Sequence, residues 1–114
     1  ILDKRSRPAG PLHGIPLAVK DIISTKTMPT TCGSAIYRDH VVGKDADCVT
    51  RLVRAGAIVL GKAVTTEFAG GHAGKTHNPH NLRHTPAGSS SACRSYSRAP
   101  CSRPPVSSSA PCVI

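Results

Sequence analysis

The chain has few aromatic residues, few acids and no long apolar run. Of its 114 residues, two are Tyr, one is Phe and none is Trp. Aliphatic side chains must therefore supply most of the buried surface, and we expect a thin core in at most one domain. The sequence shows neither a signal peptide nor an apolar run of membrane-spanning length, so it does not support secretion or membrane insertion.

Acids are scarce relative to bases: six Asp and Glu face 15 Lys and Arg, for a formal net charge of +9. Such a balance suggests an anionic partner. The bases up to residue 91 are nevertheless scattered singly, and no basic stripe is interleaved with aromatic residues. We therefore expect no nucleic-acid partner.

The five cysteines lack CxxC spacing, which disfavours both a zinc site and a disulfide framework. Free thiols in a cytoplasmic protein are the simpler interpretation. Several histidines lie between residues 72 and 84, but Pro79 and the neighbouring Asn residues indicate turns, and no acid lies nearby. We expect no metal and no cofactor.

Hydrophobic patterning predicts a strand, a helix and a second strand. Residues 15–23 form a short apolar run typical of a buried strand. Residues 45–56 predict a helix with Asp45 as its N-terminal cap and Gly56 in the left-handed position after its end. Residues 57–60 predict the second strand, ended by Gly61. This order favours a parallel pair and an α/β fold. The expected inward stripe of the helix is Val49, Leu52 and Val53.

The remaining segments predict connections. Residues 24–44 predict a long irregular link with a short element at Ala35–Tyr37, and residues 65–74 and 77–88 predict loops. From residue 92 to residue 114 the chain becomes rich in Ser, Pro, Arg and Cys without periodicity. Such a tail is typical of disorder.

Lys20 and the run Gly88-Ser89-Ser90-Ser91 suggest chemistry. A lysine that closes a buried strand must be neutral or paired, because burial of a lone ammonium is costly. A neutral amine beside a serine hydroxyl can move protons. The simpler alternatives are a lysine that reaches water and a flexible Gly/Ser loop. These simpler alternatives become less favoured only if Lys20 and the serine run fold next to each other.

Residues 69–76 imitate a phosphate-binding loop. The first required glycine falls on Ala69, and the residues after Thr76 cannot readily begin a helix. We therefore reject a nucleotide site.

Three stretches, in this order, resemble the amidase signature family of Ser–cis-Ser–Lys hydrolases: Gly10–Ile23, Ala55–Ala69 and Asn78–Ser91. The resemblance implies a mixed β-sheet covered by helices, with residues 1–91 forming part of that domain. It implies that Lys20 is the catalytic lysine and Ser89 the bridging serine, joined to Gly88 by a cis peptide bond. It also implies cleavage of small-molecule carboxamides without a cofactor.

The chain departs from the family pattern after Ser91. The family has Gly where this chain has Ala87 and Ala92, and its nucleophilic serine is expected near Val113. Nothing in residues 92–114 resembles the nucleophile motif. Residues 103–111 instead resemble that motif read in a shifted frame, which suggests a frameshift or sequencing error after Ser91.

Two functions therefore compete. The first is a truncated amidase, whose first residue is Ile1, that lacks its nucleophile and is inactive by itself. The second is a non-catalytic basic polypeptide that binds anionic partners. The sequence leaves the oligomeric state open.

Overall fold

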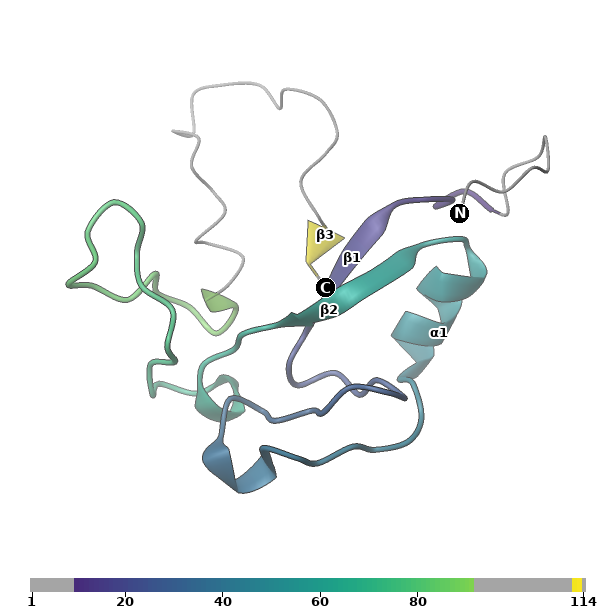
Figure 1. Ribbon diagram of the computed structural model, residues 1–114. Coiled ribbons are helices and arrows are strands. Elements are labelled where there is room, and N and C mark those ends of the chain that lie inside the picture. The colour runs from purple at the N-terminus through teal and green to yellow at the C-terminus, as the bar shows by residue number, and fades with distance from the viewer. Residues whose placement is uncertain (1–9, 92–111, 114) are drawn as a thin grey trace.

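The computed structural model describes residues 10–91 and 112–113 of the chain. Within these residues, the structure describes three strands, one α-helix and two single-turn 3₁₀ helices (Figure 1). None of the helices within the described residues has the length and apolar character needed to cross a bilayer. The elements are β1 (Pro16–Lys20), η1 (Ala35–Tyr37), α1 (Asp47–Arg54), β2 (Ile58–Ala63), η2 (Glu67–Ala69) and β3 (Cys112–Val113).

β1 and β2 form the parallel pair that the sequence predicts, so the α/β fold class is confirmed. Pro16 pairs with Ile58 and Lys20 with Ala63. The strand is shorter than the apolar run 15–23, because the chain turns directly after Lys20: the amide of Ile23 donates to the Lys20 carbonyl at 2.9 Å. Lys20 therefore stands at the carboxyl end of β1.

The predicted end of β2 at Gly61 is wrong. The strand runs through Gly61 to Ala63, and an irregularity in the register absorbs one extra residue. Leu17 pairs with Val59 and Ala18 with Gly61, so Leu60 is the residue without a partner in β1. A bulge of this kind explains how a glycine is kept inside the strand.

The helix follows its prediction with one correction at its start. α1 begins at Asp47, and Ala46 rather than Asp45 occupies the capping position, without a side-chain cap. The Asp45 carboxylate instead accepts a 2.7 Å hydrogen bond from the backbone amide of Lys26. The Asp45 side chain therefore binds the distant Lys26 amide and does not cap α1. Gly56 takes the expected left-handed conformation, with φ of +98°.

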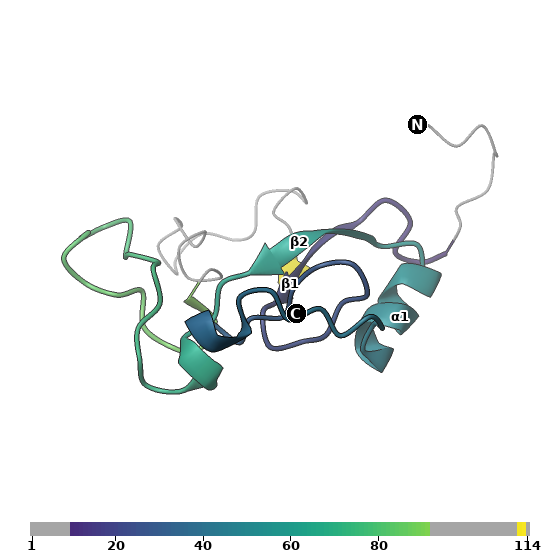
Figure 2. The same ribbon diagram turned by 60° about the horizontal axis from the view of Figure 1, so that its bottom comes forward.

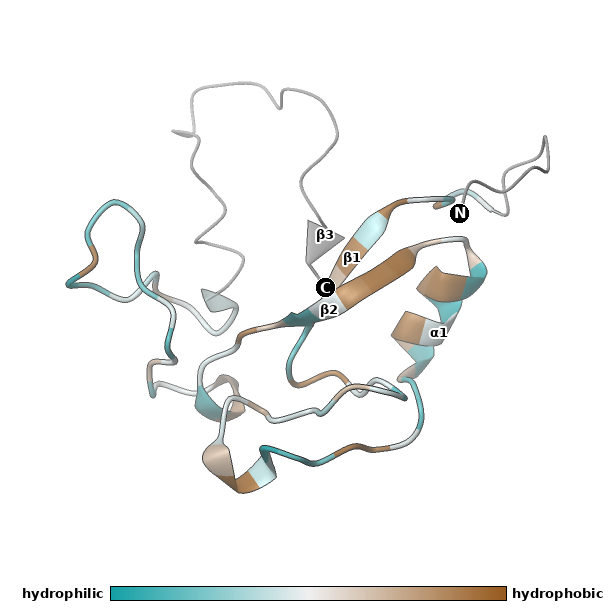
Figure 3. Cartoon of the chain, viewed as in Figure 1, coloured by the Kyte–Doolittle hydropathy of each residue, from teal (hydrophilic) through white to brown (hydrophobic). Residues whose placement is uncertain are grey.

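The core is as thin as the composition predicts. α1 and the long connection after β1 lie on one side of the strand pair (Figures 1 and 2). Val53 is 46% exposed, so the predicted inward stripe is wrong at that residue. Hydrophobic β2 residues remain uncovered, with Ile58 52% and Leu60 65% exposed (Figure 3). The buried apolar side chains in the described residues are Leu17, Val19, Val49, Ala57 and Ala63.

The connections contain a little more structure than predicted. η1 occupies the predicted short element, whereas η2 lies in the predicted loop 65–74. The amide of Phe68 donates to the Cys32 carbonyl at 2.7 Å, and the rings of Tyr37 and Phe68 meet edge to face. η2 forms because these contacts with the first connection fix its single turn.

β3 corrects the expectation of an irregular tail at two residues. Cys112 and Val113 pair in parallel with Leu17 and Ala18, which gives the strand order β2-β1-β3. Backbone pairing requires no side-chain periodicity, so the sequence pattern could not reveal it. The rest of the predicted tail, residues 92–111 and residue 114, lies outside the described part of the chain.

Substitution by Ala should destabilise the fold more at Gly56, just before β2, than at Gly61, within β2. A Cβ on Gly56 would lie 2.8 Å from the Cα of His13 in addition to the left-handed strain. We expect Gly56→Ala to lower the free energy of unfolding by about 1–3 kcal/mol. Gly61→Ala is the control, because its Cβ would meet no atom within 4 Å. Urea unfolding measures both, and equal midpoints would contradict the prediction.

Candidate functional site

Lys20 and Ser89 meet across the carboxyl end of β1. The Nζ of Lys20 donates a hydrogen bond to the Oγ of Ser89 at 2.8 Å, and the contact is partly buried. Successive strand residues point to opposite faces, so Lys20 lies on the face opposite the buried Leu17 and Val19. The structure thus brings together the two residues that the sequence singles out, while their catalytic role stays a prediction.

The segment after β2 holds Ser89 in place. The buried Thr65 hydroxyl donates to the Ser89 carbonyl at 2.7 Å, and the amide of Thr66 donates to the same oxygen at 3.2 Å. Ser91 is buried too, and its hydroxyl donates to the Val64 carbonyl at 3.2 Å. Residues 64–66 therefore anchor the serine run from one side.

The expected cis peptide bond between Gly88 and Ser89 is absent: no cis bond occurs among the described residues. A non-proline cis bond costs about 2.5–4 kcal/mol and persists only where the surrounding structure enforces it. Here Gly88 turns the chain with φ of +75°, and the hydrogen bonds to Ser89 reach it from β1 and residues 65–66. A trans bond satisfies these contacts without the cis penalty.

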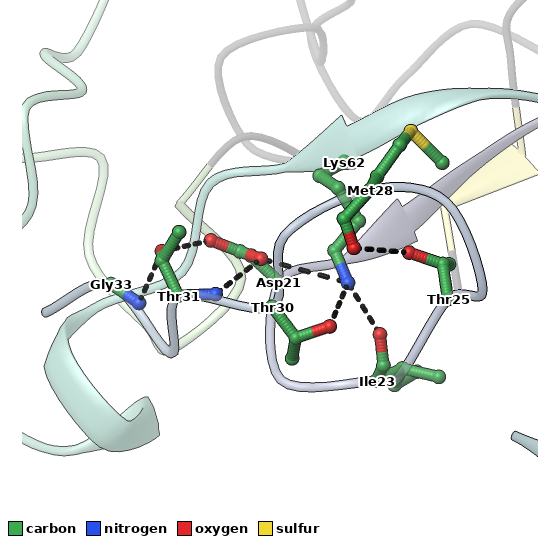
Figure 4. Close-up of polar contacts among 8 residues, drawn as sticks. All are labelled: Asp21, Ile23, Thr25, Met28, Thr30, Thr31, Gly33 and Lys62. Carbon is green, nitrogen blue, oxygen red and sulfur yellow. Dashed lines mark hydrogen bonds and ion pairs between the residues drawn. The ribbon is translucent and has the colours of Figure 1, made fainter. Parts of the chain in front are cut away.

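Asp21, directly after Lys20, organises the opposite face of the strand pair. Its carboxylate accepts hydrogen bonds from the amide and the hydroxyl of Thr31 and forms an ion pair with Lys62, with Oδ1 and Nζ 3.6 Å apart (Figure 4). The ammonium of Lys62 also donates to the carbonyl of Ile23 and, at 3.0 Å, to the hydroxyl of Thr30. These bonds fold residues 21–31 back onto β2.

Burial lowers the pKa of Lys62 below its usual 10.5, although the charge of Asp21 and its hydrogen bond act in the opposite direction. The ion pair alone would suggest a raised pKa. Desolvation outweighs the ion pair and lowers the pKa of Lys62, because its side chain is only 13% exposed and the charged form is penalised.

Small residues enclose a space beside Ser89. A cavity of about 290 Å³ is lined by Ser89, Ser91 and Thr66 together with glycine-rich segments. The Thr66 hydroxyl is buried without a hydrogen-bond partner in the described chain. The cavity leaves room for a reacting group next to the lysine–serine contact.

The loop histidines form no metal cluster: in residues 10–91 and 112–113, no three His, Cys, Asp or Glu side chains are grouped to hold an ion. Turns account for this part of the chain, since the amide of Asn78 donates to the His84 carbonyl and that of Asn81 to the Asn78 carbonyl.

Comparison with known proteins decides the family. A model of the Amidase family matches residues 1–93. The chain belongs to the amidase family. Curated relatives include the glutamyl-tRNA(Gln) amidotransferase A subunits of Oleidesulfovibrio alaskensis (46% identical over 89 residues, covering 73% of this chain and 18% of the relative) and Symbiobacterium thermophilum (49% over 88 residues, 72% and 18%).

Solved structures of amidase-family proteins share the fold. The native peptide amidase of Stenotrophomonas maltophilia superposes with a TM-score of 0.68 at 41% identity, over 75% of this chain and 20% of that one. An amidase family protein of Bacillus anthracis gives a TM-score of 0.68 at 33% identity, over 76% and 20%. The chain therefore spans about a fifth of the length of these relatives.

Sequence reasoning missed the residues that support Lys20 and Ser89. Thr65 and Thr66 lie within a stretch that the family resemblance covers. A Thr-Thr pair has no sequence feature that would predict its hydrogen bonds to the distant Ser89 carbonyl. Asp21 and Lys62 offered a clearer signal. Asp21 lies within the first predicted buried strand and Lys62 follows the Gly61 that ends the second, and charged residues at such positions require partners.

The partly buried Lys62 should make the free energy of unfolding depend on pH. Its pKa is lowered in the folded chain, so between that value and 10.5 the unfolded chain binds more protons, and stability rises with pH. The destabilising effect of a charged Lys62 is full below the folded pKa and vanishes above 10.5. We expect Lys62→Met to remove the rise in stability that urea unfolding detects as the pH increases toward 10.5. The exposed-site control Lys44→Met should keep it, and an unchanged rise in Lys62→Met would refute the assignment.

Proposed function

We propose that this chain carries the lysine–serine half of an amidase site that hydrolyses carboxamide C–N bonds. The observation that carries the proposal is the 2.8 Å hydrogen bond between Lys20 Nζ and Ser89 Oγ in a chain of the amidase family. The names of the relatives, a peptide amidase and two amidotransferase components, denote amide chemistry in those proteins.

The contact suits a proton relay. A neutral Lys20 amine accepts the Ser89 proton along the line of the existing hydrogen bond, while Ser89 Oγ accepts a proton from a nucleophilic serine. The nucleophile's oxygen bonds to the amide carbon, the C–N bond breaks, and the amine leaves with a proton. Water then releases the acid from the acyl-enzyme.

The surroundings of Ser89 favour this role over a purely structural one. The Ser89 carbonyl already receives two hydrogen bonds from Thr65 and Thr66, so its position is fixed without the help of Lys20. The hydroxyl accepts the hydrogen bond from Lys20, and Ser89 lines the 290 Å³ cavity, where a small amide would fit. We place this chemistry in the reducing cytoplasm, in keeping with the free thiols of Cys32 and Cys48.

The nucleophile is the missing component. Val113 stands where family spacing expects the serine. Loss of one member of a cooperating catalytic set removes most of the rate. We therefore expect the 114-residue chain to show no hydrolysis of carboxamides or nitroanilides above the uncatalysed rate. Turnover by the purified chain that Lys20→Met abolishes would refute this expectation.

A chimera tests the lysine–serine half directly. Residues 10–91 of this chain would replace the matching segment of the S. maltophilia peptide amidase, which supplies its own remaining residues. We expect an active enzyme in which Lys20→Met or Ser89→Ala lowers kcat/KM roughly 10³-fold, the range of a lost acid–base group.

The matched control is Lys26→Met in the same chimera. Lys26 is exposed and its only described hydrogen bond uses the backbone amide, so the rate should change less than about twofold. Thermal melting of each variant separates loss of chemistry from loss of fold. A Lys20→Met chimera that melts like its parent and keeps its rate would exclude the relay.

A further inference from the structure

A second and larger cavity lies on the Asp21 face of the strand pair. It measures about 480 Å³, within the range of small-molecule sites. The first connection, residues 64–65 directly after β2 and residues 73–75 line it. Its surface is mainly apolar, supplied by Val64 and several Gly and Ala residues. Its lining does not include Lys20 or Ser89, although it borders the smaller cavity at Ala73 and Gly74.

Almost every polar side chain around this cavity is already engaged. Asp21 bonds to Thr31 and pairs with Lys62, which neutralises its charge (Figure 4). The Ser34 hydroxyl donates to the carboxylate of Glu67 at 2.6 Å, and the Thr65 hydroxyl to the Ser89 carbonyl. None of these groups is left to recognise a ligand without losing an existing bond.

Arg38 and Lys75 are the exceptions. Both line the cavity, both are exposed, and the side chain of neither forms a hydrogen bond or ion pair with the described chain. They come from two separate connections, and the one acid in the lining is already paired. The cavity therefore presents two uncompensated positive charges at the border of an apolar hollow.

We propose that this cavity binds a small organic anion: a carboxylate with a compact apolar body. The apolar body would occupy the hollow beside Val64, and the carboxylate would lie between the guanidinium of Arg38 and the ammonium of Lys75. A neutral ligand would leave both cations unused, and a cationic ligand would be repelled. This inference does not depend on the proposed role of Lys20.

Benzoate is a suitable probe, with benzamide as its neutral counterpart of the same shape. We expect benzoate to shift the amide signals of Gly33, Ala35 and Gly74 in ¹H–¹⁵N spectra of the full chain with a saturable, millimolar Kd. Benzamide should bind at least about fivefold more weakly, the effect of losing a charge-assisted contact. Equal binding of the two would overturn the anion site, and no saturable shift would overturn the cavity as a site.

Single substitutions then test the two cations. Arg38→Ala and Lys75→Ala should each weaken benzoate binding roughly threefold to fivefold, as expected for a partly solvated charge pair. The matched controls are the exposed Arg83→Ala and Lys44→Ala, which lie outside the cavity lining and should leave Kd unchanged. Equal losses in all of these variants would indicate general attraction to a basic chain and would overturn the site.

The spectrum without ligand is a further check. The cavity exists only if residues 31–38 and 73–75 fold against each other, so a chain without dispersed amide signals would overturn the proposal. The variants should keep the dispersion of the parent chain, because the Arg38 and Lys75 side chains form no hydrogen bond or ion pair that holds the described fold together.

Discussion

The parallel pairing of β1 with β2 is the interaction on which the rest of the structure depends. It sets Lys20 beside Ala63, and the chain that leaves β2 then supplies Thr65 and Thr66, which hold the Ser89 carbonyl. Lys20 and Ser89 are far apart in sequence and meet only because this register fixes where each strand ends. A slip by one residue would turn Lys20 to the opposite face and break the contact.

The alternation of a strand also explains why two charged neighbours have different surroundings. Lys20 lies on one face and reaches Ser89, whereas Asp21 lies on the other and meets Lys62 and Thr31. The Asp21 network fastens the connection directly after Lys20 to β2. It therefore limits how far the end of β1 can move, and with it the lysine amine, without any contact to Ser89.

The sequence alone predicted those features that depend only on neighbouring residues. The two strands were predictable from short apolar runs, the helix from the spacing of its apolar residues, and the conformation of Gly56 from its position after that helix. Prediction failed where a distant group replaced a local one. The carboxylate of Asp45 accepts a hydrogen bond from the Lys26 amide and does not cap the helix. β3 forms by backbone pairing, which leaves no pattern in the side chains. The meeting of Lys20 with Ser89 was expected only from family resemblance, since spacing alone cannot place two segments together.

Because the core is thin, polar contacts contribute much of what positions Lys20 and Ser89. The buried apolar residues of the described chain are all aliphatic, and apart from Leu17 they are Val and Ala, whose side chains are small. Dispersion among so few atoms cannot fix a loop to within a hydrogen-bond length. Threonine and serine hydroxyls fix the loop around Ser89, and an ion pair fixes the connection that begins at Asp21. Such bonds are directional, so they can hold Lys20 and Ser89 within hydrogen-bond distance even though apolar side chains such as Ile58 on β2 lie exposed.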